Sequence, residues 1–365
     1  MASLVVRRQS LGNRPPRIII PPRNSKDEND ITYDETQSPS LDTDTPEPLA
    51  VTPPIPAGLS PDLQPNTPPI IDSKNDKVLQ IGKYLLVALI DNLVYKAVDI
   101  HTNEEKVCKV FTQENYRSKI AAYCRLYENS SVVEITEIIQ GDRFVYVFFN
   151  KHYGDLHSYV RSKKRLKADE AVRLFQQIAQ AVAECHDCGV VIRDLKLRKF
   201  VFTDKERTRI QLEGLEDSHL LNDDDDDILK DKQGCPAYVS PEILECAQSG
   251  YSGKASDQWS SGVMLYTMLI GRYPFQESEP SKLFEKIKLG NFSIPNIASS
   301  KAKCLIQNLL RRDAADRLTA REVLRHPWLR VAQHSPPFNT RVPNSKECTN
   351  DHVVPDSYNL QLPHS

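Results

Sequence analysis

The chain has 365 residues and a formal net charge of −2 at pH 7. This length allows one large core or two lobes, and the near-neutral charge gives no reason to expect direct nucleic-acid binding. No run of about 18 apolar residues is present, so we expect no membrane-spanning helix. The first residues, MASLVVRRQS, lack the apolar core of a secretory signal, and the eight scattered cysteines are typical of a reducing compartment.

Proline dominates the first segment, residues 1–76. It holds 14 of the 25 prolines and five Ser/Thr-Pro steps, which begin at Ser38, Thr45, Thr52, Ser60 and Thr67. A segment of this composition cannot bury enough apolar surface to offset its ordering entropy, so we predict that residues 1–76 form a disordered tail. A second hypothesis is that proline-directed kinases modify these five steps.

Strand patterns begin near Gln80 and open a folded domain that we place at residues 77–330. Apolar residues either alternate with polar residues or follow one another directly in three segments, IGKYLLVALIDNLVYKAVDI, KVCKVF and FVYVFFN. Many of these residues are β-branched or aromatic, as is typical of strands. They predict a strand-rich N-lobe over about residues 80–150.

Helical patterns follow and predict a C-lobe over about residues 151–330. Residues 168–189 have apolar positions at helical spacing, and residues 253–275 are apolar nearly all round, which favours a buried helix. Two shorter amphipathic helices fit SKAKCLIQNLLRR and TAREVLRHPWL. Periodicity is then lost, so we predict that residues 331–365 form a second disordered tail.

The motifs of this domain carry a family resemblance. Their order and spacing resemble those of a eukaryotic protein kinase domain. The motifs, in chain order, are IRDLK, GCPAYVSPEIL, SDQWSSGVMLY, GRYPF, RLT and HPW. The resemblance covers about residues 80–330 and implies a bilobal α+β fold. It also implies a buried ion pair between Glu242 and Arg317, and an aspartate, Asp257, that holds the catalytic-loop backbone.

Kinase chemistry needs phosphate-cradling glycines, a paired lysine, a base and two metal ligands. By resemblance, Lys109 matches the lysine, Asp194 the base and Lys196 the lysine beside it. The phosphate loop, YLLVALIDNLVYKA, has no glycine, and Val87, Leu89 and Asn92 fall at the three glycine positions. The helix expected in QENYRSKIAAYCRLYEN has no acid in its middle, so we predict that the usual ion pair with Lys109 is absent and that this helix is short or bent.

Both metal-binding positions are altered. Lys199 stands where the resemblance places asparagine, and Gly214 begins a Gly-Leu-Glu in place of Asp-Phe-Gly. Losing metal stabilisation should cost several kcal/mol, and about 4 kcal/mol is roughly a thousandfold in rate. We therefore predict no catalytic residues, only vestigial Lys109, Asp194 and Lys196, and neither a metal nor a required cofactor. An alternative is that Glu213, Glu216 or Asp217 supplies the missing carboxylate.

Three further stretches each allow a structural and a functional interpretation. Cys185 and Cys188 have metal-like spacing, but no second pair lies where a zinc site would need one. The acidic run at residues 222–231 is expected to be a solvated loop, with a docking site for a basic partner as the alternative. The basic run at residues 161–167 is expected to cover the start of the next helix, with nuclear import as the alternative.

The chain resembles the Tribbles pseudokinases. The features that carry this resemblance are a phosphate loop without glycine, a Gly-Leu-Glu in place of Asp-Phe-Gly, and the stretches IRDLKLRKFVF and DKQGCPAYVSPEIL. This resemblance implies an adaptor that acts in the nucleus and cytoplasm, without direct contact with nucleic acid or membrane. The implied partners are an E3 ubiquitin ligase of the constitutive photomorphogenic type, MAP kinase kinases, and substrates such as CCAAT/enhancer-binding transcription factors.

The resemblance also implies two binding motifs. The ligase would bind the tail motif Asp351, His352, Val353, Val354, Pro355 and Asp356, in which histidine replaces the glutamine usual in the family. A MAP kinase kinase would bind Val323, Leu324, His326, Pro327, Trp328 and Leu329, although such a His-Pro-Trp segment also closes the last helix of ordinary kinases. Two rival functions remain: a weak, metal-independent Ser/Thr kinase that uses Lys109 and Asp194, and a switch that binds ATP weakly without hydrolysing it.

Overall fold

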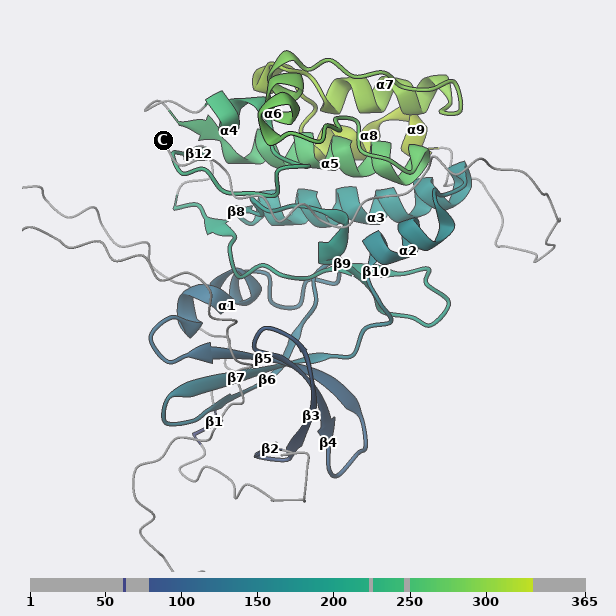
Figure 1. The fold of residues 1–365 in the computed structure, drawn as a ribbon. Helices are drawn as coiled ribbons and strands as arrows, with labels where there is room; N and C mark the ends of the chain where they lie inside the picture. The colour runs from purple at the N-terminus through teal and green to yellow at the C-terminus, as the bar shows by residue number, and fades with distance from the viewer. Residues whose placement is uncertain (1–61, 64–78, 223–225, 246–249, 331–365) are drawn as a thin grey trace, which may run out of the picture.

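The computed structural model describes residues 62–63, 79–222, 226–245 and 250–330, which form a strand-rich lobe and a helical lobe (Figure 1). The expected bilobal α+β fold is confirmed. Almost all of the two tails, residues 1–76 and 331–365, lies outside the described residues. Among the described helices, none is long and apolar enough to cross a bilayer.

The N-lobe is built on a seven-stranded sheet with the order β1-β6-β7-β5-β4-β3-β2. Its strands are β1 (Asp62–Leu63), β2 (Leu79–Ile81), β3 (Tyr84–Asp91), β4 (Val94–Asp99), β5 (Glu105–Thr112), β6 (Ile135–Gln140) and β7 (Phe144–Asn150). Neighbours pair antiparallel, except that β1 runs parallel to β6. Strand β1 lies within the predicted tail, residues 1–76, and adds to the otherwise unpaired edge of β6.

The helices lie as the apolar patterns predict, with differences at their ends. They are α1 (Tyr116–Arg125) in the N-lobe and, in the C-lobe, α2 (Leu156–Lys163), α3 (Ala168–Asp187), α4 (Pro241–Glu245), α5 (Gly253–Ile270), α6 (Pro280–Leu289), α7 (Ser300–Leu309), α8 (Ala320–Arg325) and α9 (Pro327–Arg330). The segment TAREVLRHPWL forms two helices rather than one. His326 has extended backbone dihedrals there, because the following proline disfavours the helical conformation in the residue before it.

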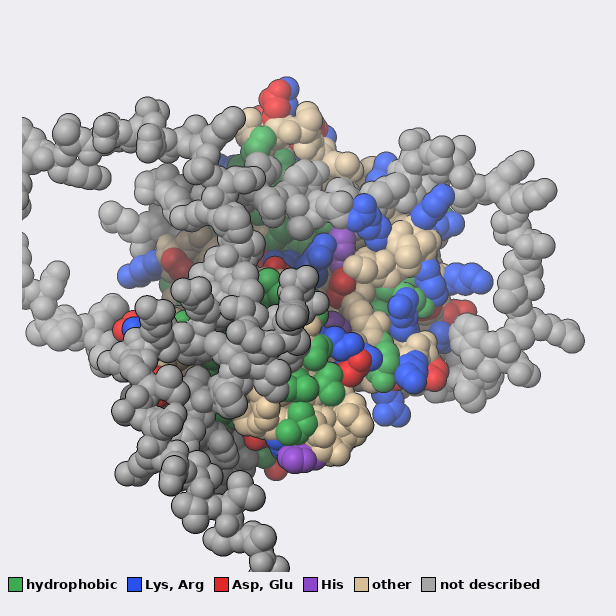
Figure 2. Space-filling model, turned by 60° about the horizontal axis from the view of Figure 1, so that its bottom comes forward, with side chains coloured by type: hydrophobic (Ala, Val, Ile, Leu, Met, Phe, Trp, Pro, Cys, Tyr) green, Lys and Arg blue, Asp and Glu red, His purple; other side chains and the backbone are tan. Residues whose placement is uncertain are grey.

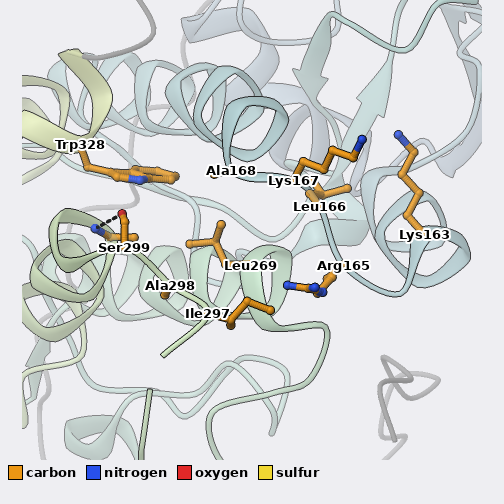
Figure 3. A pocket seen from close by; sticks show the side chains of 11 residues that line it. Lys163, Arg165, Leu166, Lys167, Ala168, Leu269, Ile297, Ala298, Ser299 and Trp328 are labelled. Atoms are coloured by element: carbon orange, nitrogen blue, oxygen red, sulfur yellow. Dashed lines mark hydrogen bonds between the residues drawn. The ribbon is translucent and has the colours of Figure 1, made fainter. Parts of the chain in front are cut away.

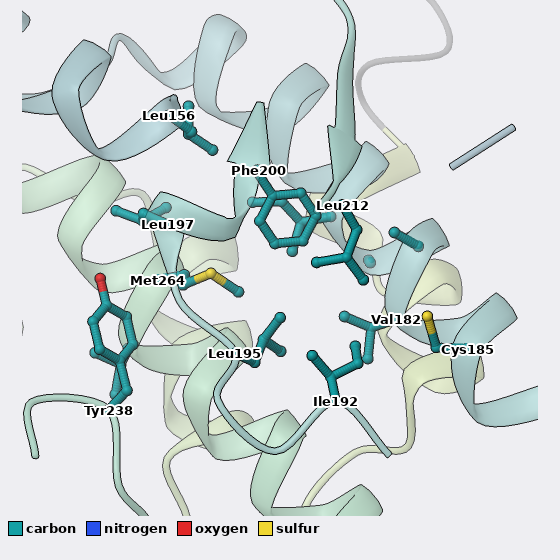
Figure 4. Packing of buried hydrophobic residues seen from close by; sticks show 14 of the residues in the cluster. Leu156, Val182, Cys185, Ile192, Leu195, Leu197, Phe200, Leu212, Tyr238 and Met264 are labelled. Atoms are coloured by element: carbon teal, nitrogen blue, oxygen red, sulfur yellow. The ribbon is translucent and has the colours of Figure 1, made fainter. Parts of the chain in front are cut away.

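Short strand pairs connect the C-lobe helices. They are β8 (Val190–Val191) with β11 (His219–Leu220), β9 (Phe200–Phe202) with β10 (Ile210–Leu212), and β12 (Ile228–Leu229) with β13 (Tyr251–Ser252). The segment between β8 and β9 contains the motif IRDLK. Its apolar residues Ile192, Leu195 and Leu197 point into the core beside Met264 of α5 (Figure 4). Burial of these side chains fixes the loop that carries Asp194.

Two acids, the partly buried Glu242 and the buried Asp257, brace the C-lobe as the kinase resemblance implies. The Glu242 carboxylate accepts from both terminal nitrogens of Arg317, at 2.5 and 2.7 Å. Asp257 accepts from the main-chain N–H groups of Ile192 and Arg193, at 2.8 and 2.9 Å. The two Asp257 bonds satisfy backbone N–H groups that burial removes from water, so they hold the loop between β8 and β9 against α5.

The two charged runs both lie in the C-lobe. Residues 161–163 end α2, the next residues form a turn, and Lys167 is the N-cap of α3, so the basic run reaches the start of α3 only at its last residue. Within the acidic run, Asp227 accepts from the Ser252 hydroxyl at 2.6 Å and the Lys254 N–H at 2.8 Å, and Asp231 pairs with Arg193. Its described part is tied to the C-lobe at Asp227 and Asp231, although the Asp226 and Asp231 side chains are exposed to solvent; residues 223–225 lie outside the described residues.

Candidate functional site

Lys109 lies on β5 and is the first residue of the candidate site. Its side chain is buried, and its ammonium nitrogen lies 2.9 Å from Glu213 Oε1 and 2.8 Å from Glu216 Oε1. Burial by itself would lower the pKa of Lys109, but the two carboxylates outweigh it and the pKa is raised. Lys109 is therefore a charged structural cation that joins the N-lobe sheet to the Gly-Leu-Glu segment.

Tyr123 lies near the C-terminal end of α1, the helix in which the kinase pattern would place the acidic partner of Lys109. Its hydroxyl accepts from the N–H groups of Gly214 and Leu215, at 2.9 and 3.0 Å, and donates to Glu216 Oε1 at 3.1 Å. The predicted loss of the usual ion pair and the short helix are both confirmed, since α1 has 10 residues and no acid. Tyr123 was not predicted as a site residue from the sequence. The signal that could have found it is its polar hydroxyl within the apolar stretch IAAYC.

Lys199 and Gly214 stand at the two altered metal-binding positions, and the fold brings them together. The Lys199 side chain is buried, and its ammonium donates to the Gly214 carbonyl oxygen. Burial lowers the pKa of Lys199 from its ordinary value. Gly214 has a φ of +77°, and a Cβ there would contact the Lys199 side chain at 3.5 Å. The lysine chain thus fills the space beside residue 214.

The three acids proposed as substitute metal ligands all contact lysines. Glu213 and Glu216 flank Lys109, while Asp217 lies 2.8 Å from the Lys119 ammonium. Burial would raise the pKa of Glu216, but Lys109 beside it holds the pKa below its ordinary value. Within the described part of the chain, no group of three or more His, Cys, Asp or Glu side chains is arranged to hold a metal ion. The negative charge of this segment is largely compensated by lysine.

Asp194 and Lys196 lie together in the loop between β8 and β9. Asp194 Oδ2 accepts from the Lys196 ammonium at 2.6 Å, and both side chains are partly exposed. The pair keeps the geometry of a base beside a lysine.

The segment that replaces the phosphate loop is the β3–β4 hairpin. Its turn is formed by Asn92 and Leu93, and Leu93 has a φ of +58°. Val87, Leu89 and Ile90 on β3 are 42%, 47% and 57% exposed. Apolar side chains gather on this face of the molecule, with Lys and Arg side chains beside them (Figure 2). Bulky side chains thus stand where a phosphate-binding loop needs bare backbone.

The second candidate motif closes the C-lobe. Val323, Trp328 and Leu329 are buried, with Trp328 packing 6.0 Å from the Phe175 ring, while Leu324 and His326 are half-buried. Only Pro327 is exposed among the six. Core packing therefore accounts for the three apolar side chains, and partner binding at this motif stays a prediction.

The ligase motif lies outside the described residues. All six of its members, Asp351, His352, Val353, Val354, Pro355 and Asp356, belong to the tail at residues 331–365. Binding at this motif also stays a prediction.

The fold and the site define a protein of the protein-kinase class. Residues 92–329 match the protein kinase domain family. The chain is 56% identical to Tribbles homolog 2 of Canis lupus familiaris over 270 residues, which cover 74% of this chain and 78% of that protein. It is 51% identical to Tribbles homolog 1 of Homo sapiens over 278 residues, 76% and 73% of the two chains. With Tribbles homolog 3 of Rattus norvegicus it shares 45% identity over 323 residues, 87% and 86% of the two chains. The chain belongs to the Tribbles family of pseudokinases.

Proposed function

We propose that this chain is a catalytically inactive adaptor that brings bound substrates to an E3 ubiquitin ligase of the constitutive photomorphogenic type. The lack of activity rests on one observation: the Lys199 ammonium is buried against the Gly214 carbonyl, between the two positions that hold magnesium in kinases. A cation at that place repels a second cation. Without magnesium, the charge that develops during phosphoryl transfer has no metal to stabilise it.

The adaptor part of the proposal is supported by the chain's organisation. A braced folded domain is followed by a 35-residue segment, 331–365, that carries the Val-Pro motif flanked by acids. We propose that the domain holds a transcription-factor substrate of the CCAAT/enhancer-binding kind and a MAP kinase kinase, while the tail engages the ligase. This activity would take place in the nucleus and cytoplasm, without direct nucleic-acid or membrane contact.

A co-precipitation experiment tests the adaptor. The full chain and a chain lacking residues 348–365 are each presented to the ligase's substrate-binding domain, and captured proteins are identified. We expect the ligase to be lost with the tail while proteins held by the folded domain stay bound. Equal ligase capture by the two chains would overturn the proposal.

The rival kinase function rests on the retained Lys109 and Asp194. Asp194→Ala removes the only matched base, so a weak kinase would lose its cellular effect in this variant, while an adaptor would keep it. Substrate degradation in cells is the measurement, and the melting temperature of the variant confirms that it folds.

Any ATP binding is expected to be weak and independent of magnesium, because Lys199 and Gly214 replace the metal ligands. A thermal-shift titration with ATP checks this, once with magnesium and once with a chelator. The two melting curves should shift equally. A much larger shift in magnesium would show that carboxylates such as Glu213 are released from Lys109 to bind the metal.

His326→Ala is expected to weaken co-precipitation of a MAP kinase kinase and to leave ligase binding unchanged. His326 is half-buried at the break between α8 and α9, burial lowers its pKa, and its Nδ1 accepts from the Trp328 N–H at 3.2 Å. Loss of this hydrogen bond should cost about 0.5–1.5 kcal/mol, which lowers the melting temperature by only a few degrees. A fall of many degrees would instead assign this motif to core packing alone.

A further inference from the structure

A pocket lies in the C-lobe, away from Lys109 and Lys199, among α2, α3, α5, α7 and α9 (Figure 3). Its cavity volume is about 290 Å³. The apolar part of its lining includes Leu166, Leu269, Ile297, Ala298, Ala302 and Trp328. Ile297 is 53% exposed at the rim, so an apolar surface continues from the cavity to solvent.

The charged lining residues of this pocket are all cations, Lys163, Arg165 and Lys167. Lys163 is paired with Glu170 at 2.7 Å. Arg165 and Lys167 have no ion-pair partner anywhere in the described ranges, which end at residue 330. Trp328 lies at one end of the pocket, and Lys163 and Lys167 lie at the other (Figure 3). The pocket therefore has an apolar end and a cationic end.

The backbone that carries these cations is fixed in place. The Leu166 N–H donates to the Met268 carbonyl at 2.8 Å, which ties the turn before α3 to the end of α5. At Gly271 the φ is +84°, and a Cβ would lie 2.1 Å from the Lys164 carbonyl oxygen, so only glycine allows this close approach. The side-chain oxygen of Ser299 accepts from the Ala302 N–H at 3.3 Å, which satisfies this polar group internally. Such a site needs little rearrangement before it binds.

We propose that this pocket binds a single-chain anionic amphiphile, namely a medium-chain fatty carboxylate. Its aliphatic chain would pack on Leu269, Ala302 and Trp328, and its carboxylate would meet Arg165 and Lys167. The volume is at the lower end of the roughly 300–1,000 Å³ of small-molecule pockets, and an α-helix about 10 Å across would not enter it. Charge and size together favour one apolar chain with one anionic head. The proposal is independent of the adaptor function.

Decanoate is the probe, used with the full chain below its micelle-forming concentration. Calorimetry measures the affinity, and methyl NMR follows Ile297 and Leu269. We expect both methyl signals to shift, and we expect decanol to bind more weakly and decyltrimethylammonium not to bind. Arg165→Ala/Lys167→Ala should weaken decanoate binding at least about tenfold, since charge-assisted hydrogen bonds are lost. The matched control is Lys205→Ala/Arg209→Ala, which removes an exposed lysine and arginine from the β9–β10 connection.

A second variant tests the apolar rim. Ile297→Glu places a like charge at the mouth and should abolish decanoate binding, while Leu289→Glu, at a residue 62% exposed on α6, should leave it unchanged. Melting curves confirm that the four variants fold. Unchanged affinity in Arg165→Ala/Lys167→Ala, or unshifted Ile297 and Leu269 signals, would overturn the proposal. If a peptide of residues 347–360 shifts these signals and decanoate does not, the pocket is a peptide-docking site and the proposal is wrong.

Discussion

Arg317→Met is expected to lower the free energy of unfolding by about 3–5 kcal/mol. The Arg317 guanidinium is buried and donates to both Glu242 carboxylate oxygens, and it also donates to the carbonyl oxygens of Arg311 and Ala255 at 2.8 and 3.0 Å. Methionine would leave the Glu242 carboxylate, whose side chain is only 18% exposed, without its partner. Apolar packing by methionine cannot offset a buried, unpaired charge. Urea denaturation of the full chain, followed by tryptophan fluorescence, measures the change.

A neighbouring arginine provides the control for this variant. Arg311 pairs with Asp316 at 3.5 Å, and the two side chains are 48% and 59% exposed. Arg311→Met should therefore change the stability by no more than about 1 kcal/mol. The double variant Glu242→Gln/Arg317→Met removes both charges and should regain part of the loss. If Arg317→Met costs no more than Arg311→Met, the buried pair does not brace the C-lobe.

Val354→Ala/Pro355→Ala is expected to weaken ligase binding about a hundredfold, a loss of roughly 2–4 kcal/mol. Valine supplies a small apolar anchor, and proline restricts φ, which lowers the entropy cost of ordering the peptide. Asp351 and Asp356 would add charges that suit a basic rim on the ligase. The measurement is a titration of the peptide of residues 347–360, with and without the two changes, against the ligase's substrate-binding domain.

The same tail contains a matched control, because Val342 and Pro343 form a second Val-Pro step without flanking acids. In the full chain, Val342→Ala/Pro343→Ala should leave ligase recruitment and substrate degradation intact, whereas Val354→Ala/Pro355→Ala should abolish both. Neither change should alter the melting temperature, since both lie beyond the folded domain. Undetectable binding of the unaltered peptide at high micromolar concentration would contradict the adaptor function.

Most of the fold could be predicted from local patterns. Apolar periodicity located α3 and α5 because each buries most of its length, and the order of the kinase motifs assigned the two lobes. Helix ends were less predictable: the break at His326 depends on the following proline, and the basic residues 161–166 belong to α2 and the turn after it, with only Lys167 capping α3. Pairing of β1 with β6 was not predictable, because a two-residue strand depends on an edge supplied elsewhere in the chain.

The sequence by itself determined the kinase resemblance, and through it predicted which groups are missing from the positions of kinase catalysis: glycines from the phosphate loop, and the asparagine and aspartate at Lys199 and Gly214. Only the tertiary structure decided what the remaining charges do. Lys109 could have paired with α1, with a nucleotide or with the acids on either side of Gly214. The observed pairing joins residues about 100 positions apart in the chain. The structure places Glu213 and Glu216 on Lys109, and places Lys199 on the Gly214 carbonyl. Electrostatic energy depends on distance and burial, which residue spacing along a chain does not give.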